Sequence, residues 1–314
     1  RKEGLAMQNA FYNEIKTWMY RNARHVELCL WQYFFEDGDK KAVADALLSY
    51  QNEDGGFGHV LEPDNWNPNS TPASTDHALG LLRLAGFEDM EHPVYQGIWK
   101  YLEAEKDLAD YGWRFTVESN DDYPHAPWWN YSEEMNRKEY LGMTASFAAF
   151  ILKYGDPESP LYQKALTFTH AFLEMLTQDM SYGEMGLSGY MVLIDTIREI
   201  SLGGYDGDAL VKALGGKIKK AIGEDETIWE QYGVRPSNFI NSPSSVFYED
   251  NAEMVEKELQ YLLDTKPKDG VWGITWTWFD NMAQYGDAFI LIENWWKGSR
   301  AIMNTLFLRN FGKL

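Results

Sequence analysis

The sequence has little cysteine, a deficit of basic residues and no long apolar run. Its 314 residues include a single cysteine, Cys29, which excludes an internal disulfide and a cysteine-based zinc site within one chain. Against 48 acidic residues stand only 28 lysines and arginines, giving a formal charge of −20. Such a surface repels phosphate backbones and anionic membranes, so we expect no nucleic-acid partner.

The apolar runs are short. The run at 147–152 is far below the ~20 residues that cross a bilayer, which predicts no membrane span. The chain also lacks the charged start and apolar core of a signal peptide. Together with the lone cysteine, these features predict a cytoplasmic protein, and they leave its oligomeric state open.

Aromatic residues are abundant. They make up 15% of the chain and include 13 tryptophans. This density exceeds what a core requires and suits a pocket that stacks on sugars or encloses a hydrocarbon. We therefore expect a small-molecule ligand.

Helical spacing of apolar residues dominates the chain, and no linker divides it. The pattern predicts one all-α domain over residues 1–314. Ser74 or Thr75 is expected to cap the helix that ends at Gly86, and Ser159-Pro160 to begin another. Helices are predicted at 5–35, 41–51, 73–86, 91–105, 132–154, 160–178, 186–202, 208–222, 250–264 and 283–309. Short strands are predicted at 113–119 and 273–278.

Two segments share one pattern. Residues 51–58, QNEDGGFG, and residues 266–273, KPKDGVWG, both contain Asp-Gly, one residue, an aromatic residue and Gly. Each follows one predicted helix and precedes another. A repeat of one helix pair in roughly fifty residues predicts about six pairs, arranged as an inner and an outer ring.

This pattern resembles the Gln-x-x-x-Gly-x-Trp-type repeat of squalene-hopene and oxidosqualene cyclases and of protein prenyltransferase β-subunits. Gln51, Gly55 and Phe57 match its three positions, with Phe in place of Trp. In the second copy Lys266 replaces the Gln and Trp272 is the aromatic residue. The strings DGGFGHVLEPD and YPHAPWW are similar to those of an uncharacterised bacterial prenyltransferase-like group. The resemblance implies an (α/α)6 toroid.

The resemblance does not extend to the superfamily's catalytic motifs. The Asp-x-Asp-Asp string of the class II cyclases does not occur. Asp121-Asp122 is followed by Tyr-Pro-His, so the Asp-Asp-x-x-Asp magnesium motif lacks its third carboxylate. Cys29 lacks the context of the prenyltransferase zinc site. We therefore expect neither a metal nor another cofactor.

The long loop at 51–72 is the first candidate site, because loops of this length in compact proteins are usually functional. Glu62 and Asp64 lie close together beside His59, and two differently tuned carboxyl groups suit acid/base work on a glycosidic bond or an alkene. We predict these three as catalytic residues and Trp66 as a ligand contact. In the alternative interpretation both carboxylates cap turns or pair with an arginine.

The loop NDDYPHAPWWN is the second candidate. His125, between two prolines, is predicted as a catalytic residue, and Tyr123, Trp128 and Trp129 as a stacking platform. The alternative is a hydrophobic plug at one end of the barrel. Arg114 is expected to neutralise one of the loop acids and to contact the substrate.

Aromatic residues near the C-terminus complete the predicted site. Trp276 and Trp278 would line the pocket from one side of the strand predicted at 273–278. Trp295 and Trp296 are assigned to the core, and His77 to packing or solvation.

Three hypotheses remain open. The first is an acid/base enzyme, a hydrolase, lyase or cyclase, acting on a carbohydrate or a related polar small molecule. The second is a divergent isoprenoid cyclase or prenyl-binding enzyme. The third is a binding or scaffold protein without catalysis.

Overall fold

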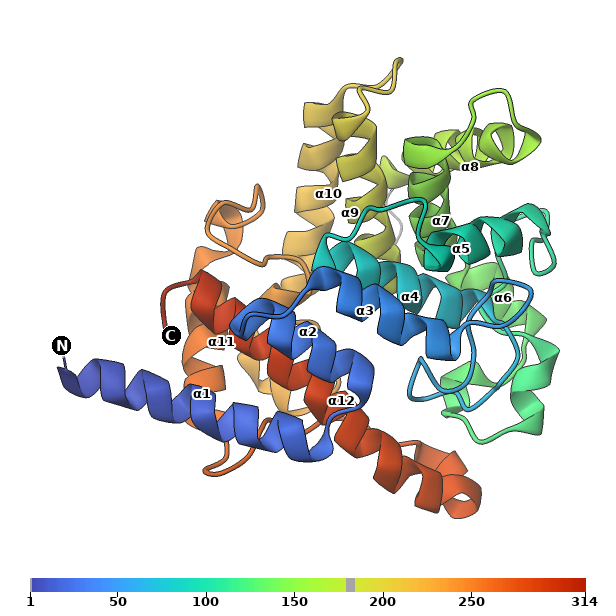
Figure 1. The fold of residues 1–314 in the computed structure, drawn as a ribbon. Helices are drawn as coiled ribbons and strands as arrows, with labels where there is room; N and C mark the ends of the chain where they lie inside the picture. Colours follow the sequence, from blue (N-terminus) through green and yellow to red (C-terminus); the bar gives the residue numbers. More distant parts are fainter. Residues whose placement is uncertain (1, 179–183) are drawn as a thin grey trace.

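The computed structural model describes residues 2–178 and 184–314, whose course is drawn in Figure 1. In these ranges twelve α-helices form the molecule, which confirms the all-α prediction. They are α1 (Lys2–Asn22), α2 (His25–Phe35), α3 (Lys40–Leu47), α4 (Pro72–Ala85), α5 (Pro93–Glu103), α6 (Glu133–Glu139), α7 (Leu141–Tyr154), α8 (Pro160–Leu176), α9 (Glu184–Glu199), α10 (Gly207–Ile222), α11 (Ala252–Thr265) and α12 (Met282–Asn310). Short 3-10 helices lie in the connections between them.

The prediction of two strands is wrong for the described residues, where only isolated β-bridges occur. Residues 113–117 and 273–278 form irregular connections instead, and Glu118 begins a short 3-10 helix. In the first of these, side chains take the place of a neighbouring strand. Thr144 accepts a hydrogen bond from the backbone N–H of Trp113, and Asn136 accepts one from that of Thr116.

The helix predicted over 5–35 is interrupted. α1 ends at Asn22 and α2 begins at His25, because Arg24 has extended backbone angles. Its guanidinium donates hydrogen bonds to the carbonyl groups of Val60 and Leu61, at 2.6 and 3.2 Å. The break therefore ties the N-terminal helices to the long loop.

The start of α4 differs from the prediction by a few residues. Thr71, rather than Ser74 or Thr75, is the N-cap, and its side chain accepts a hydrogen bond from the backbone N–H of Ser74. Gly86 ends the helix with a φ of +61°, as predicted. Ser159 caps α8 with proline in its first turn, which confirms the expected start signal.

Neighbouring helices follow one another around the molecule (Figure 1). α10 packs on α9, α9 on α7, α7 on α4, α4 on α3 and α3 on α2. α12 then packs against α2, α1 and α11, so the C-terminal helix lies beside helices from the start of the chain. No helix of the described part is both long and apolar enough to span a membrane.

The long loop is closed at its base. The Gln51 side-chain amide donates hydrogen bonds to the carbonyl groups of Gly55 and Val94, both at 2.9 Å. Phe57, fully buried, forms β-bridges with Gln51 and Thr71. The two ends of the loop therefore meet, and most of residues 58–70 are buried against the rest of the molecule.

Candidate functional site

Asp64 lies at the centre of an indole cage. Its side chain accepts a hydrogen bond at Oδ1 from Trp278 Nε1, at 2.6 Å. At Oδ2 it accepts two more, from Trp296 Nε1 at 2.9 Å and from Trp276 Nε1 at 3.2 Å. Asp64 is buried, and a buried carboxylate is tolerated only where donors satisfy it. Three indole N–H groups provide that compensation.

The cage joins distant parts of the chain. Trp276 and Trp278, predicted to line the pocket from one side of a strand, both donate to Asp64, although no strand aligns them. Trp296, on α12, was assigned to the core and its contact with Asp64 was missed. The signal in the sequence was that its N–H needs an acceptor when the ring is buried, which a core of aliphatic side chains does not supply.

Glu62 is buried beside Asp64 without equivalent partners. Only 7% of its surface is exposed, and Oε2 has no hydrogen-bond partner among the described residues. The indole N–H of Trp129 is near enough to lower the pKa of Glu62, but it makes no hydrogen bond of ordinary geometry. Burial, followed by the charge of Asp64, raises the pKa of Glu62 well above its ordinary value.

The two carboxyl groups differ in protonation. Burial raises the pKa of Asp64 to about 6, and the three indole donors oppose that rise. The pKa of Glu62 is raised by burial and by Asp64, with only partial opposition from the charge of Arg24. Within this pair, Asp64 is therefore the group that ionises more readily and Glu62 the group that holds its proton.

Arg24 supports the loop from behind, and it was not singled out in the sequence. Besides its bonds to the loop backbone, it forms a buried ion pair with Glu27. Its guanidinium lies 5.3 Å from the Trp295 ring centroid and 5.7 Å from that of Tyr50. Its neighbours Arg21, Asn22 and His25 are polar, so the sequence carried no local signal that Arg24 is buried.

The two candidate loops share one site, a point that the sequence leaves open. The backbone N–H of Ala126 donates to the carbonyl of Asp64 at 2.8 Å, and that of Trp66 donates to Pro124 at 2.9 Å. The Asn120 side-chain oxygen accepts from the amides of Asn65 and Asn67, at 3.0 and 2.9 Å. This buried amide network locks the second loop against the first.

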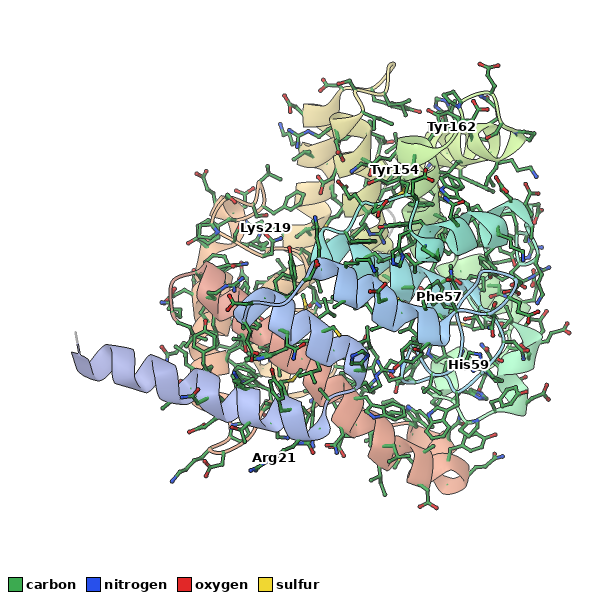
Figure 2. All side chains as sticks on the ribbon, viewed as in Figure 1. Arg21, Phe57, His59, Tyr154, Tyr162 and Lys219 are labelled. Carbon is green, nitrogen blue, oxygen red and sulfur yellow. The ribbon has the colours of Figure 1, made fainter. Side chains whose placement is uncertain are left out.

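The two histidines predicted as catalytic have other partners. His59 is exposed on the long loop (Figure 2), and its Nε2 lies 2.8 Å from the Asn52 side-chain oxygen. His125 is buried, with Nδ1 2.6 Å from the Tyr123 carbonyl oxygen and Nε2 2.7 Å from the Asn130 side chain. Both ring nitrogens of His125 are engaged, which gives it a role in holding its loop.

His77 lies at the cage, although the sequence assigned it to packing or solvation. On α4, its ring meets the Trp296 ring edge-on, with centroids 6.2 Å apart. Burial, together with the positive charge of Arg24, lowers the pKa of His77 to about 4. A neutral imidazole therefore borders the cage at physiological pH.

The predicted stacking residues divide into two groups. Trp66 stacks on Trp295, with ring centroids 6.1 Å apart, and both are partly exposed. Trp129 is buried against Phe115, which favours the interpretation of this residue as a plug. Trp66 therefore keeps a surface that a ligand can contact, whereas Trp129 fills the interior.

The three remaining predicted contacts lie around the second loop or farther away. Tyr123 is partly buried, and its carbonyl accepts from His125. Trp128 meets the exposed Phe279 edge-on. Burial raises the pKa of Asp107, and the charge of nearby Arg114 is one of the effects that oppose this rise, so Arg114 lies near an acid outside the two loops.

Among residues 2–178 and 184–314, no group of three or more His, Cys, Asp or Glu residues is arranged to hold a metal ion. Comparison of the chain with protein-family models, with curated proteins and with solved structures found no match. The geometry of the loops and the cage therefore carries the functional inference.

Proposed function

We propose that the protein is an acid/base enzyme in which buried Glu62 donates a proton to a carbohydrate or a related polar small molecule. The observation that carries this proposal is the unpartnered, buried Oε2 of Glu62 beside the fully bonded Asp64. A carboxyl group that keeps its proton at neutral pH is what general acid catalysis requires. Structural carboxyl groups, in contrast, normally have both oxygens satisfied when buried.

Asp64 has a complementary role. Because both of its oxygens accept indole N–H bonds, it is held in one orientation and cannot easily act as a nucleophile. A fixed anion stabilises the positive charge that develops on carbon when a glycosidic oxygen or an alkene is protonated. The reaction class is therefore proton-initiated, as in a hydrolase, a lyase or a cyclase.

The surroundings favour a ligand that carries hydroxyl groups. The partly exposed rings of Trp66, Trp276 and Trp296 offer stacking faces. The imidazole of His77, which is partly exposed, lies beside the last of these rings. Flat aromatic faces combined with polar groups suit sugars better than bare hydrocarbons.

Two other functions have an observation in their favour. An isoprenoid cyclase or prenyl-binding protein is favoured by the indole rings around one acid, because such rings stabilise cations. A non-catalytic binding or scaffold protein is favoured by the saturation of Asp64 and by the two bonds of His125. Only the binding or scaffold protein would leave Glu62 without a proton-transfer role.

The same proposal includes the finer features of the fold. We infer an (α/α) toroid of about six helix pairs, as the resemblance to prenyltransferase-like proteins implies. The succession of helix contacts from α10 back to α2 and on to α12 supports a continuous curved layer of packed helices, which a toroid requires. A single domain, a cytoplasmic location and the absence of nucleic-acid partners remain expectations from the sequence.

The Glu62→Gln variant tests the proposal. It replaces the acid with an amide of the same shape, so turnover is expected to fall by 10²-fold or more. Substrates are first sought by thermal shift with two panels, oligosaccharides and prenyl diphosphates. Stabilisation by prenyl diphosphates alone would return the chain to the isoprenoid alternative.

A matched control is Glu258→Gln. Glu258 is also fully buried with a raised pKa, but it accepts hydrogen bonds from Ser237 in another part of the fold. This variant is expected to lose stability and to keep its turnover per folded molecule. Equal loss of turnover in both variants would contradict the assignment of Glu62 as the proton donor.

A further inference from the structure

A second polar cluster lies between α4 and α7, outside the indole cage. Arg83 Nη2 donates to Ser146 Oγ at 2.6 Å, and the Ser146 hydroxyl donates in turn to Asp76. Arg83 and Asp76 are 3.6 Å apart, and their side chains are 35% and 22% exposed. The carboxylate of Asp76, the guanidinium of Arg83 and the hydroxyl of Ser146 therefore form one connected group, which is partly exposed and open to a ligand.

This cluster borders a hollow with a volume of about 150 Å³ between α4, α7 and α9. Ser188, Met185 and Val192 form the part of its wall that α9 contributes. α7 and α9 approach closely beside it, because a Cβ on Gly189 would lie 2.6 Å from the carbonyl oxygen of Gly142. A cavity of about 150 Å³ accommodates a benzene-sized ring.

Gly80 does not line the hollow itself, but it leaves open space on the same helix between Asp76 and Arg83, which do. It follows Asp76 by four residues and precedes Arg83 by three, so the three positions lie on one face of α4. No heavy atom lies within 4 Å of a Cβ built on Gly80. Glycine destabilises a helix interior relative to alanine, so this position gives up helix stability while leaving space beside the cluster.

The charge balance indicates what could bind. The Asp76–Arg83 pair has no net charge, so neither an anion nor a cation gains from the cluster as a whole. A carboxylate only accepts hydrogen bonds and a guanidinium only donates them, whereas a hydroxyl group does both. Two adjacent hydroxyl groups on a ring match such a pair, because each can donate a hydrogen bond to the Asp76 carboxylate and accept one from the Arg83 guanidinium.

We propose that this hollow is a second subsite, which binds one hydroxyl-bearing ring of a neutral ligand through Asp76, Arg83 and Ser146. It rests on the proposed function, because the two sites are joined by α4. His77, the residue after Asp76, contacts Trp296 of the indole cage. A ligand of more than one ring would reach from the cage along α4 into the hollow.

The test is calorimetric titration of the full chain with cello- and malto-oligosaccharides of one to four rings. Gly80→Leu fills the open space and is expected to weaken binding of the longer sugars by about tenfold or more, with a smaller effect on single rings. Ser146→Ala, which removes the bridging hydroxyl, is expected to weaken the same sugars. The matched control is Gly216→Leu, since Gly216 of α10 also has no neighbour within 4 Å of a built Cβ.

Each outcome decides between the two proposals. Wild-type affinity for the longer sugars in both Gly80→Leu and Ser146→Ala would overturn the subsite, even if Glu62→Gln abolished turnover. Weakened binding in both, with Gly216→Leu unchanged, would support the subsite, even if Glu62→Gln left turnover intact. If no sugar binds the wild-type chain, the subsite is overturned, and the proton donor is judged by its own turnover test.

Discussion

The two copies of the Gly-aromatic repeat have one pattern and supply different chemistry to one site. The copy at 51–58 leads into the loop that carries Glu62 and Asp64. The copy at 266–273 leads into the segment whose Trp276 and Trp278 donate hydrogen bonds to Asp64. The acid and its donors thus follow equivalent positions of the repeat. The repeat directs both loops to the same place, and the residues beyond it determine what each contributes.

The copies also differ in how tightly they are built. Gly55 has a φ of +89°, and a Cβ there would lie 1.9 Å from the carbonyl oxygen of Gly97. Gly270 has a negative φ, and the nearest atom to its Cβ position is 3.6 Å away, on Pro267. The first copy therefore depends on glycine, whereas the second tolerates a side chain.

The largest expected effect is that of Gly55→Ala. Left-handed backbone strain adds to the overlap with Gly97, so the variant should lose about 4 kcal/mol of unfolding free energy. The matched change, Gly270→Ala, should alter stability by less than about 1 kcal/mol. Urea unfolding measures both. Similar losses in the two variants would show that the copies are structurally equivalent after all.

The carboxyl groups that follow the first copy titrate, whereas the indole donors that follow the second copy do not, so the pH dependence of stability reports on the first loop. The folded-state pKa of Asp64, about 6, lies above its ordinary value of 3.8. Folding therefore favours the protonated form, and this contribution is complete below about pH 4 and lost as the pH rises through 6. The difference between these two pKa values corresponds to about 3 kcal/mol of unfolding free energy.

Urea unfolding of the wild type and of Asp64→Asn at pH 4 to 8 measures this contribution. The free energy of the wild type relative to the variant should decrease by about 3 kcal/mol across the range. Burial also raises the pKa of Glu62, so ionisation of Glu62 destabilises the wild type at higher pH. In Glu62→Gln this part of the pH dependence should be lost, and the unfolding free energy should change less with pH. Parallel curves for the wild type and Asp64→Asn would contradict the shift.

At pH 7, Asp64→Asn is expected to lose about 2 kcal/mol through its hydrogen bonds alone. An asparagine has one accepting oxygen, and its amide nitrogen would face the N–H groups of Trp276 and Trp296. Trp276→Phe removes the longest of the three bonds and should lose less. Tryptophan fluorescence during unfolding reports both changes. A greater loss in Trp276→Phe would mean that stacking, rather than the carboxylate, holds the cage together.

Features of the structure that depend on neighbouring residues could be predicted from the sequence, and contacts between residues far apart in the chain could not. The helices from α8 onward agree within a few residues, because apolar spacing and caps such as Ser159 are local signals. Only Pro63 separates Glu62 from Asp64 in the sequence, so their closeness in space could be predicted. The contact of Asp64 with Trp296 spans 232 residues, and no local pattern encodes such a contact. Arg24 was missed for the same reason.

The smallest expected effect comes from making the second copy resemble the first by Lys266→Gln. Lys266 forms an ion pair with Glu14 at 2.6 Å, whereas Gln51 binds backbone carbonyl groups. The Lys266 side chain is 5% exposed and that of Glu14 is 32% exposed, so water can still reach the carboxylate, and the loss should be about 1 kcal/mol and shrink as salt is added. Gln51→Lys is the reverse change. It should cost more, because the bonds to Gly55 and Val94 would lose their geometry. If Lys266→Gln lost as much as Gln51→Lys at high salt, the first position of the repeat would have the same structural role in both copies.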